Sequence, residues 1–120
     1  MAAIDLNQHR VAILVFAMHE CPACEHYVPR LVEQVSVMRR QGAPFVIHDE
    51  NAATPPGSIP VLVYDAASED PDVQKLADRF HVEATPTTII LAREGSFKCE
   101  GSLANNQILY LLNMAHEASF

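Results

Sequence analysis

The clearest chemical signal in this chain is a pair of cysteines, Cys21 and Cys24, separated by two residues. Before them, residues 11–17 are apolar and rich in β-branched side chains, which predicts a buried strand. After them, residues 22–41 carry apolar side chains at helical spacing, which predicts an amphipathic helix. Cys21 would then lie at the N-terminus of this helix, where unpaired N–H groups favour a thiolate. Cys24 would lie one turn further along, close enough to form a small disulfide ring, and this arrangement favours redox chemistry.

The residues within and before the motif fit this interpretation. Pro22 suits the first turn of a helix, because the N–H that proline lacks would have no helical partner there. Ala23 completes the motif. A protonated His19 would stabilise a Cys21 thiolate, whereas the neighbouring carboxylate of Glu20 would oppose it. Each of these two residues also fits an ordinary surface position.

Metal binding is the main alternative use of the two cysteines. His19 and His26 lie near them in sequence, and a zinc site needs four such ligands. However, no second C-x-x-C or H-x-x-x-H motif follows, and the third cysteine, Cys99, is isolated, so we predict no metal site. An iron–sulfur cluster shared between two copies of the chain and inert packing are the remaining alternatives.

Length, composition and charge restrict the class of protein. The chain has 120 residues, which fits a single domain spanning residues 1–120. Its formal net charge of −7 and the lack of a basic stripe disfavour nucleic acid as a partner. No apolar run is long enough for a membrane span. The first residues lack the basic start and apolar stretch of a secretory signal, so we expect a cytoplasmic protein in which cysteine pairs are seldom structural.

The remaining sequence predicts an alternation of strands and helices. Residues up to about Arg10 predict a short helix or edge strand, and residues 49–60 a probable loop insertion. The other expected elements are strands at 45–48 and 61–65, a helix at 72–80 begun by Asp70, a β-hairpin of 88–91 and 96–99, and a final helix capped by Ser102. Of the two strands, 61–65 is favoured as the central one. Four phenylalanines are expected in the core: Phe16, Phe45, Phe80 and Phe97.

Several of these features together resemble the thioredoxin family over nearly the whole chain. They are the cysteine pair after a hydrophobic strand, Pro29 eight residues beyond the first cysteine, residues 80–87 with their Thr85-Pro86 step, Gly95 and Gly101. The resemblance implies an α/β protein of thioredoxin fold, in which helices flank a central mixed β-sheet. Two residues depart from the best-known members: Glu20 replaces a tryptophan, and Val15 replaces a buried aspartate that helps the second cysteine lose its proton.

The resemblance also implies a mechanism and partners. Cys21 would attack a disulfide in a protein substrate, and Cys24 would resolve the mixed disulfide. Pro86, in the cis form, would hold the backbone of Thr85 beside Cys21 to pair with the substrate. No bound cofactor is implied, but a thioredoxin reductase or another dithiol donor would recycle the pair. The glutathione-holding residues of glutaredoxins are missing from 87–94. A catalytically weak binding, assembly or redox-sensing module is the alternative function.

Overall fold

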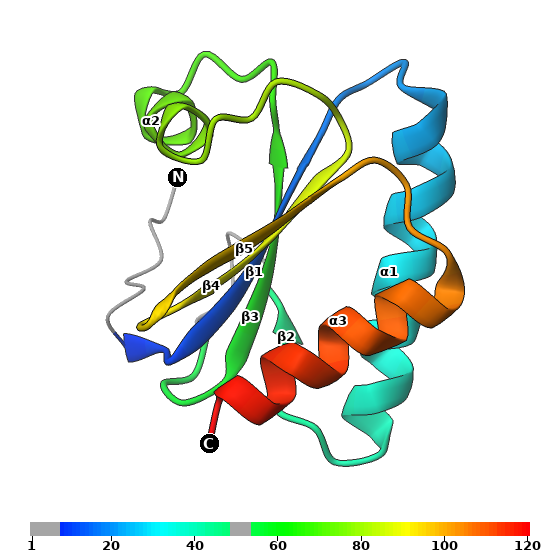
Figure 1. Cartoon of the computed structure of the whole chain (residues 1–120), viewed down its shortest axis with the longest axis vertical. Helices are drawn as coiled ribbons and strands as arrows, with labels where there is room; N and C mark the ends of the chain where they lie inside the picture. The colour runs from blue at the N-terminus through cyan, green and yellow to red at the C-terminus, as the bar shows by residue number, and fades with distance from the viewer. Residues whose placement is uncertain (1–7, 49–53) are drawn as a thin grey trace.

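The computed structural model describes residues 8–48 and 54–120, which form a five-stranded mixed sheet with helices on both faces (Figure 1). The elements in chain order are β1 (Val11–Ala17), α1 (Pro22–Arg40), β2 (Phe45–Ile47), β3 (Ile59–Asp65), α2 (Pro71–Arg79), β4 (Thr87–Ala92), β5 (Gly95–Glu100) and α3 (Asn105–Ala118). The strand order is β2-β3-β1-β4-β5. This architecture confirms the predicted thioredoxin fold.

Strand β1 lies at the centre of the sheet. It runs parallel to β3 on one side and antiparallel to β4 on the other. Residues 11–16 are each at most 2% exposed, because helices cover both faces of this strand. A strand buried on both faces is apolar throughout instead of alternating, which explains the continuous hydrophobic run in the sequence.

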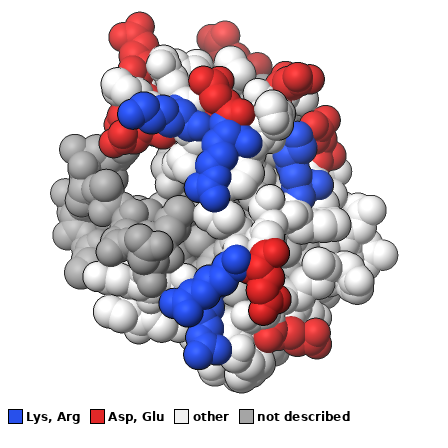
Figure 2. All heavy atoms as spheres, turned by 60° about the vertical axis from the view of Figure 1, so that its left-hand side comes forward, with Lys and Arg blue, Asp and Glu red and all other residues white. Residues whose placement is uncertain are grey.

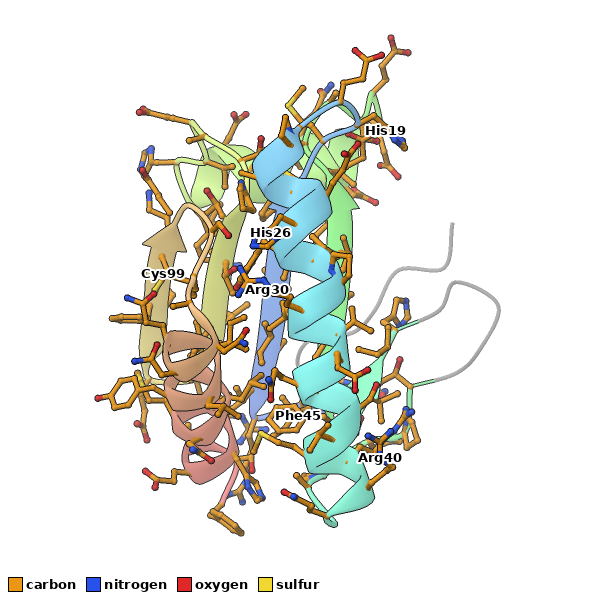
Figure 3. The ribbon with its side chains drawn as sticks, turned by 90° about the vertical axis from the view of Figure 1, so that its right-hand side faces the viewer. His19, His26, Arg30, Arg40, Phe45 and Cys99 are labelled. Atoms are coloured by element: carbon orange, nitrogen blue, oxygen red, sulfur yellow. A yellow bond between two sulfur atoms is a disulfide. The ribbon has the colours of Figure 1, made fainter. Side chains whose placement is uncertain are left out.

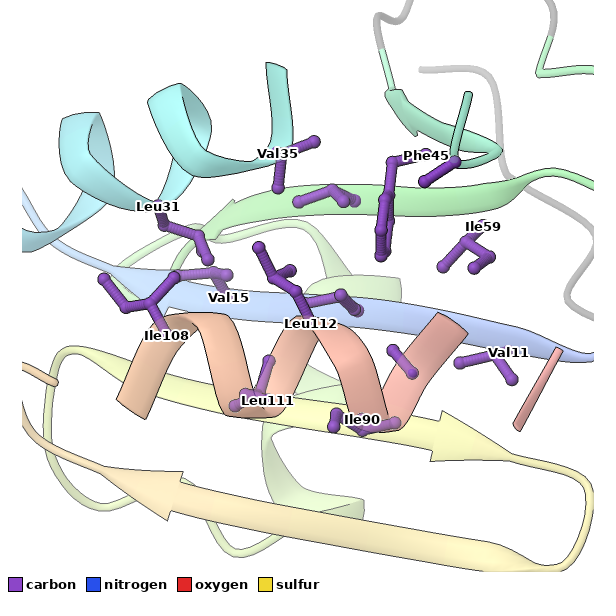
Figure 4. Close-up of a cluster of buried hydrophobic side chains, with 14 of the residues drawn as sticks. Val11, Val15, Leu31, Val35, Phe45, Ile59, Ile90, Ile108, Leu111 and Leu112 are labelled. Atoms are coloured by element: carbon purple, nitrogen blue, oxygen red, sulfur yellow. The ribbon is translucent and has the colours of Figure 1, made fainter. Parts of the chain in front are cut away.

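Helices α1 and α3 cover one face of the sheet (Figure 1). The odd-numbered residues of β1 point into the core on this face, together with side chains from both helices (Figure 4). The labelled side chains there are Val11, Val15, Leu31, Val35, Phe45, Ile59, Ile90, Ile108, Leu111 and Leu112. This cluster, the first core, joins α1, which begins beside the cysteine pair, to the centre of the sheet.

Helix α2 covers the opposite face, where the even-numbered residues of β1 form a second and smaller core. The ring of Phe16 stacks on that of Tyr64 in this core, with 5.3 Å between their centroids. The helix begins as the sequence predicts: Asp70 is its N-cap and accepts a hydrogen bond of 2.9 Å from the backbone N–H of Asp72. No helix in the described part of the chain is long and apolar enough to cross a membrane.

The structure also resolves the ambiguity between the two candidate strands. Both segments form strands, but 59–65 pairs with β1 inside the sheet, whereas 45–47 forms the short edge strand β2. The favoured strand is therefore the interior one. The prediction for residues 1–7 and part of the predicted insertion, residues 49–53, lie outside the described residues.

Two predictions from the sequence were wrong. Ser102 does not cap the last helix, since α3 begins at Asn105 and Ala104 is its N-cap. The backbone N–H of Ala104 donates to Gln107 Oε1 at 2.8 Å, so a side chain inside the helix satisfies the N–H of the N-cap residue. Phe97 is not a core residue: it is 47% exposed, because β5 lies at the edge of the sheet.

A single arginine ties α1 to the start of α3. Arg30 donates hydrogen bonds to Asn105 Oδ1 at 2.9 Å, to Ser102 Oγ at 3.1 Å and to the carbonyl of Leu103 at 2.8 Å. Figure 3 shows Arg30 midway along α1. The hydroxyl of Ser102 therefore serves this contact between helices and not a helix cap.

We expect Arg30→Ala to lower the free energy of unfolding by about 1–2 kcal/mol, because three acceptors lose a charged donor at a partly exposed site. Urea denaturation followed by circular dichroism measures the change. Arg39→Ala in the last turn of the same helix is the matched control, and a change of less than about 0.5 kcal/mol is expected for this exposed side chain. Equal losses in the two variants would contradict a specific role for Arg30.

Candidate active site

The cysteine pair lies where β1 gives way to α1. Cys21 is the N-cap of the helix, and its sulfur accepts a hydrogen bond of 3.2 Å from the backbone N–H of Cys24. Cys21 and Cys24 form a disulfide, with 5.2 Å between their Cα atoms. Pro22 occupies the first helical turn, as its missing N–H predicts. The helix N-terminus thus directs its N–H groups toward the sulfur of the first cysteine.

The two cysteines differ in exposure. Cys24 is 3% exposed and packs inside the protein, whereas Cys21 is half-buried and reachable from solvent. Of the two sulfurs, that of Cys21 is therefore the more accessible from solvent.

The loop before β4 lies against the cysteine pair. The peptide bond between Thr85 and Pro86 is cis. The hydroxyl of Thr85 lies 3.6 Å and its carbonyl oxygen 3.8 Å from Cys21 Sγ. A disulfide sulfur carries no hydrogen, so the carbonyl contact is not a hydrogen bond in this state. The structure therefore brings together Cys21, Thr85 and Pro86 from segments more than 60 residues apart in sequence.

Two hydrogen bonds hold this loop in place. The hydroxyl of Thr87 donates to the carbonyl of Ala84 at 2.6 Å, and the N–H of Gly101 donates to the carbonyl of Pro86 at 2.8 Å. Gly101 has a φ of 90°, a conformation that glycine adopts without the steric cost of a side chain. The glycine after β5 thus supports the loop beside the disulfide.

The charged residues nearest in sequence to the pair are exposed. Glu20 has a φ of 59° and ends the connection from β1. Figure 3 shows His19 at the end of the molecule where α1 begins, and His26 on the side of that helix. Among the described residues, neither His19 nor Glu20 makes a hydrogen bond or ion pair with Cys21.

A buried hydrogen bond between two hydroxyl groups, at the core under α1 and α3, was not predicted from the sequence. Tyr27, one turn beyond Cys24, shares a hydrogen bond of 2.8 Å with the hydroxyl of Thr88, and both residues are fully buried. Thr88 pairs in register with Val15, the apolar residue at the position of the expected acid. Burial raises the pKa of the Tyr27 hydroxyl, so this group stays protonated at neutral pH. The one signal in the sequence is that Tyr27 and Thr88 place hydroxyl groups at positions that are otherwise apolar in their helix and strand.

Cys99 lies on β5 and takes no part in the disulfide. It is half-buried and packs against the first core, and burial raises the pKa of its thiol. Figure 3 shows it on β5, an edge strand of the sheet.

Because a raised pKa leaves less thiolate at neutral pH, Cys99 should be alkylated several-fold more slowly than Cys21 in the reduced protein. Brief treatment with iodoacetamide at pH 7.5, followed by peptide mass spectrometry, measures the two rates. The rate at Cys99 should rise as the pH increases. In urea the two cysteines should react at similar rates, and equally fast labelling of the folded protein would contradict the role of burial.

No cluster of three or more His, Cys, Asp or Glu side chains within residues 8–48 and 54–120 could hold a metal ion. His19 and His26 do not converge with the cysteine pair on a common ligand position there.

Comparisons with known proteins agree with this geometry. Residues 1–116 match the family model of the thioredoxin-like domain. No curated protein matches the sequence. Similar solved structures include the oxidised mitochondrial thioredoxin 3 of Saccharomyces cerevisiae, with a TM-score of 0.60, 13% identity, and coverage of 93% of this chain and 82% of that one. Chloroplastic thioredoxin z gives a TM-score of 0.60 at 20% identity, covering 92% of this chain and 82% of its own.

A third similar structure is the thioredoxin of Fasciola hepatica, with a TM-score of 0.58 and 13% identity, covering 92% of this chain and 86% of that one. At such identities these structures establish the fold, and the family model establishes the family over nearly the whole length. A C-x-x-C disulfide in this fold supports thiol–disulfide oxidoreductase chemistry in general. The chain belongs to the thioredoxin-like domain family.

Proposed function

We propose that this protein reduces disulfides in partner proteins, with Cys21 as the nucleophile and Cys24 as the resolving thiol. The observation that carries the proposal is the difference in exposure between the two sulfurs at the start of α1. Cys21 is half-buried at the N-cap, and Cys24 is 3% exposed one turn inside the helix. A nucleophile that must reach another protein needs the accessible position, and the resolving thiol needs only to reach its neighbour.

The reaction balances as two thiol–disulfide exchanges. The Cys21 thiolate attacks one sulfur of the substrate disulfide, and the other substrate sulfur leaves as a thiolate that takes a proton from water. The Cys24 thiolate then attacks Cys21 Sγ, and the second substrate sulfur leaves in the same way. The substrate gains two electrons, and the protein is left with the Cys21–Cys24 disulfide seen in the structure.

The local groups favour the first step over the second. Helix N–H groups, including that of Cys24 at 3.2 Å, stabilise negative charge on the Cys21 sulfur. The thiol of Cys24 is 3% exposed, and the fully buried Val15 stands where the family resemblance implies an acid that would accept its proton. The proton of Cys24 must then pass to water or to a group of the substrate, so resolution is the slower step.

The backbone of Thr85 is the proposed contact for the substrate chain. Its carbonyl lies 3.8 Å from Cys21 Sγ, and within the described part of the chain its N–H donates no hydrogen bond. An extended substrate segment can pair with such free backbone groups while its cysteine meets Cys21. The exposed positions of His19 and Glu20 suit contacts with that same segment.

Turnover of a protein disulfide tests the proposal. The reduced protein is incubated with insulin and excess dithiothreitol, and the release of insulin thiols is followed over time. Faster reduction than by dithiothreitol alone is expected. The reduction potential of the Cys21–Cys24 pair gives the direction of electron flow. A value of about −270 mV would fit a reductant recycled by a reductase in a reducing compartment such as the cytoplasm, and a value of about −120 mV would fit an oxidant instead. If the pair cycles but no substrate is reduced faster than by dithiothreitol, a redox-sensing or assembly module replaces the proposed reductase.

A further inference from the structure

A cavity of about 320 Å³ lies at the end of the sheet opposite the cysteine pair. Its lining includes three arginines, Arg10, Arg79 and Arg93, and the imidazole of His9. Arg10 directly precedes β1 and Arg93 directly follows β4, whereas Cys21 comes after the far end of β1. The seven residues of β1 span about 20 Å, so the cavity is separate from the disulfide.

The positive charge of this cavity is unusual for the protein. The chain carries 8 Lys and Arg residues against 15 Asp and Glu, yet three of those cations line one cavity and no carboxylate is part of its lining. Within residues 8–48 and 54–120, no carboxylate lies at ion-pair distance from Arg10, Arg79 or Arg93. Figure 2 shows the face on the left-hand side of Figure 1, where Lys and Arg side chains lie above and below an area of uncharged residues, with Asp and Glu side chains next to them.

The strand register places two of these charges opposite each other. Val11 pairs with Ala92 in the antiparallel ladder, so Arg10 and Arg93 extend the same register by one position. Like charges at facing positions of a strand pair repel each other. An anion between them would remove this repulsion and could accept paired hydrogen bonds from each guanidinium.

The other lining groups complete a site of suitable size and chemistry. The small side chain of Ala12 leaves room between the charged groups, and Leu91 adds an apolar surface on the same face of the sheet. Arg79 is held over the ring of Phe80, with its guanidinium carbon 4.9 Å from the ring centroid. His9 is 4% exposed and donates from Nδ1 to the carbonyl of Ser58 at 2.9 Å, which fixes the ring at the cavity.

We propose that this cavity binds a small organic anion that carries two or more phosphate or carboxylate groups. Three guanidinium groups match two or more planar or tetrahedral anionic groups, and the apolar residues accept the carbon skeleton between them. This site is independent of disulfide reduction, so neither proposal depends on the other.

Titration of the full-length oxidised protein with pyrophosphate, and separately with citrate, tests the proposal by two-dimensional amide NMR at low ionic strength. Saturable shifts are expected at residues 9–12, 79 and 91–93, and sodium chloride at matched ionic strength should not reproduce them. Saturation with pyrophosphate alone would assign phosphate as the anionic group, and saturation with citrate alone would assign carboxylate. No saturable shift with either anion would overturn the proposal.

Matched charge variants separate a specific site from general attraction. Arg10→Gln/Arg93→Gln should weaken binding at least about tenfold, because two charged donors are removed from the cavity. Arg39→Gln/Arg40→Gln removes the same charge from the exposed end of α1 and should change affinity less than about twofold. Equal weakening in both double variants would overturn the proposal. The circular dichroism spectrum of each variant confirms that it is folded, and insulin reduction should be unchanged in both.

Discussion

Replacement of Cys21 by serine is expected to abolish disulfide reduction, leaving only the rate of the added dithiothreitol. A hydroxyl at this position is not ionised at neutral pH and cannot form a mixed disulfide, so the first exchange has no nucleophile. The insulin assay measures the loss. Cys99→Ser is the matched control and should retain full activity, because Cys99 lies on β5 and outside the disulfide.

The partner variant Cys24→Ser should behave differently. It keeps the accessible Cys21 but cannot complete the second exchange, so it should accumulate a covalent complex with the substrate. Mass spectrometry without reductant would detect this complex, and dithiothreitol would release it. If Cys21→Ser trapped the substrate and Cys24→Ser did not, the assignment of nucleophile and resolving thiol would be reversed.

The largest effect on stability is expected at Tyr27. Truncation to alanine should lower the free energy of unfolding by about 3–5 kcal/mol, as for other fully buried aromatic side chains. Because small domains are stable by only about 5–15 kcal/mol, a substantial fraction of Tyr27→Ala molecules could be unfolded at 37 °C. Urea denaturation of the oxidised protein measures the change. A loss below about 1 kcal/mol would contradict the central position of this ring in the first core.

A second pair of variants isolates the hydroxyl of Tyr27. Tyr27→Phe keeps the ring but leaves the buried hydroxyl of Thr88 without its partner, which should cost about 1–3 kcal/mol. Adding Thr88→Val removes that unpaired group, so the double variant should lose less than the sum of the two single changes. If the losses of unfolding free energy in the two single variants added up to that of the double variant, the 2.8 Å hydrogen bond would contribute no interaction free energy.

Local sequence patterns were sufficient for most elements of the fold. The apolar run of 11–17 and the helical spacing after Cys21 both reflect burial, which acts on each residue through its immediate periodicity. Asp70 could be recognised as a helix cap because the capping hydrogen bond joins residues two positions apart. Predictions of this kind succeed where the relevant partner is close in sequence.

Long-range contacts explain what could not be predicted. Ser102 has the residue type of a helix cap, but its hydroxyl accepts from Arg30, 72 residues away. Phe97 has the residue type of a core side chain, but its exposure follows from the position of β5 at the edge of the sheet. The Tyr27–Thr88 hydrogen bond spans 61 residues and depends on strand register, which the sequence did not specify. The contact of Thr85 with Cys21 was expected only through the family resemblance.

The alternation of β1 between two separate cores restricts how the chain can vary in length. Odd-numbered residues of this strand face α1 and α3, and even-numbered residues face α2. Insertion of one residue within 11–17 would exchange every side chain between the two cores, or else shift Cys21 relative to Thr85. An insertion among the exposed residues 18–20 would disturb neither core. During evolution, insertions and deletions should therefore be eliminated from the strand itself, because each one would change which side chains its two cores receive.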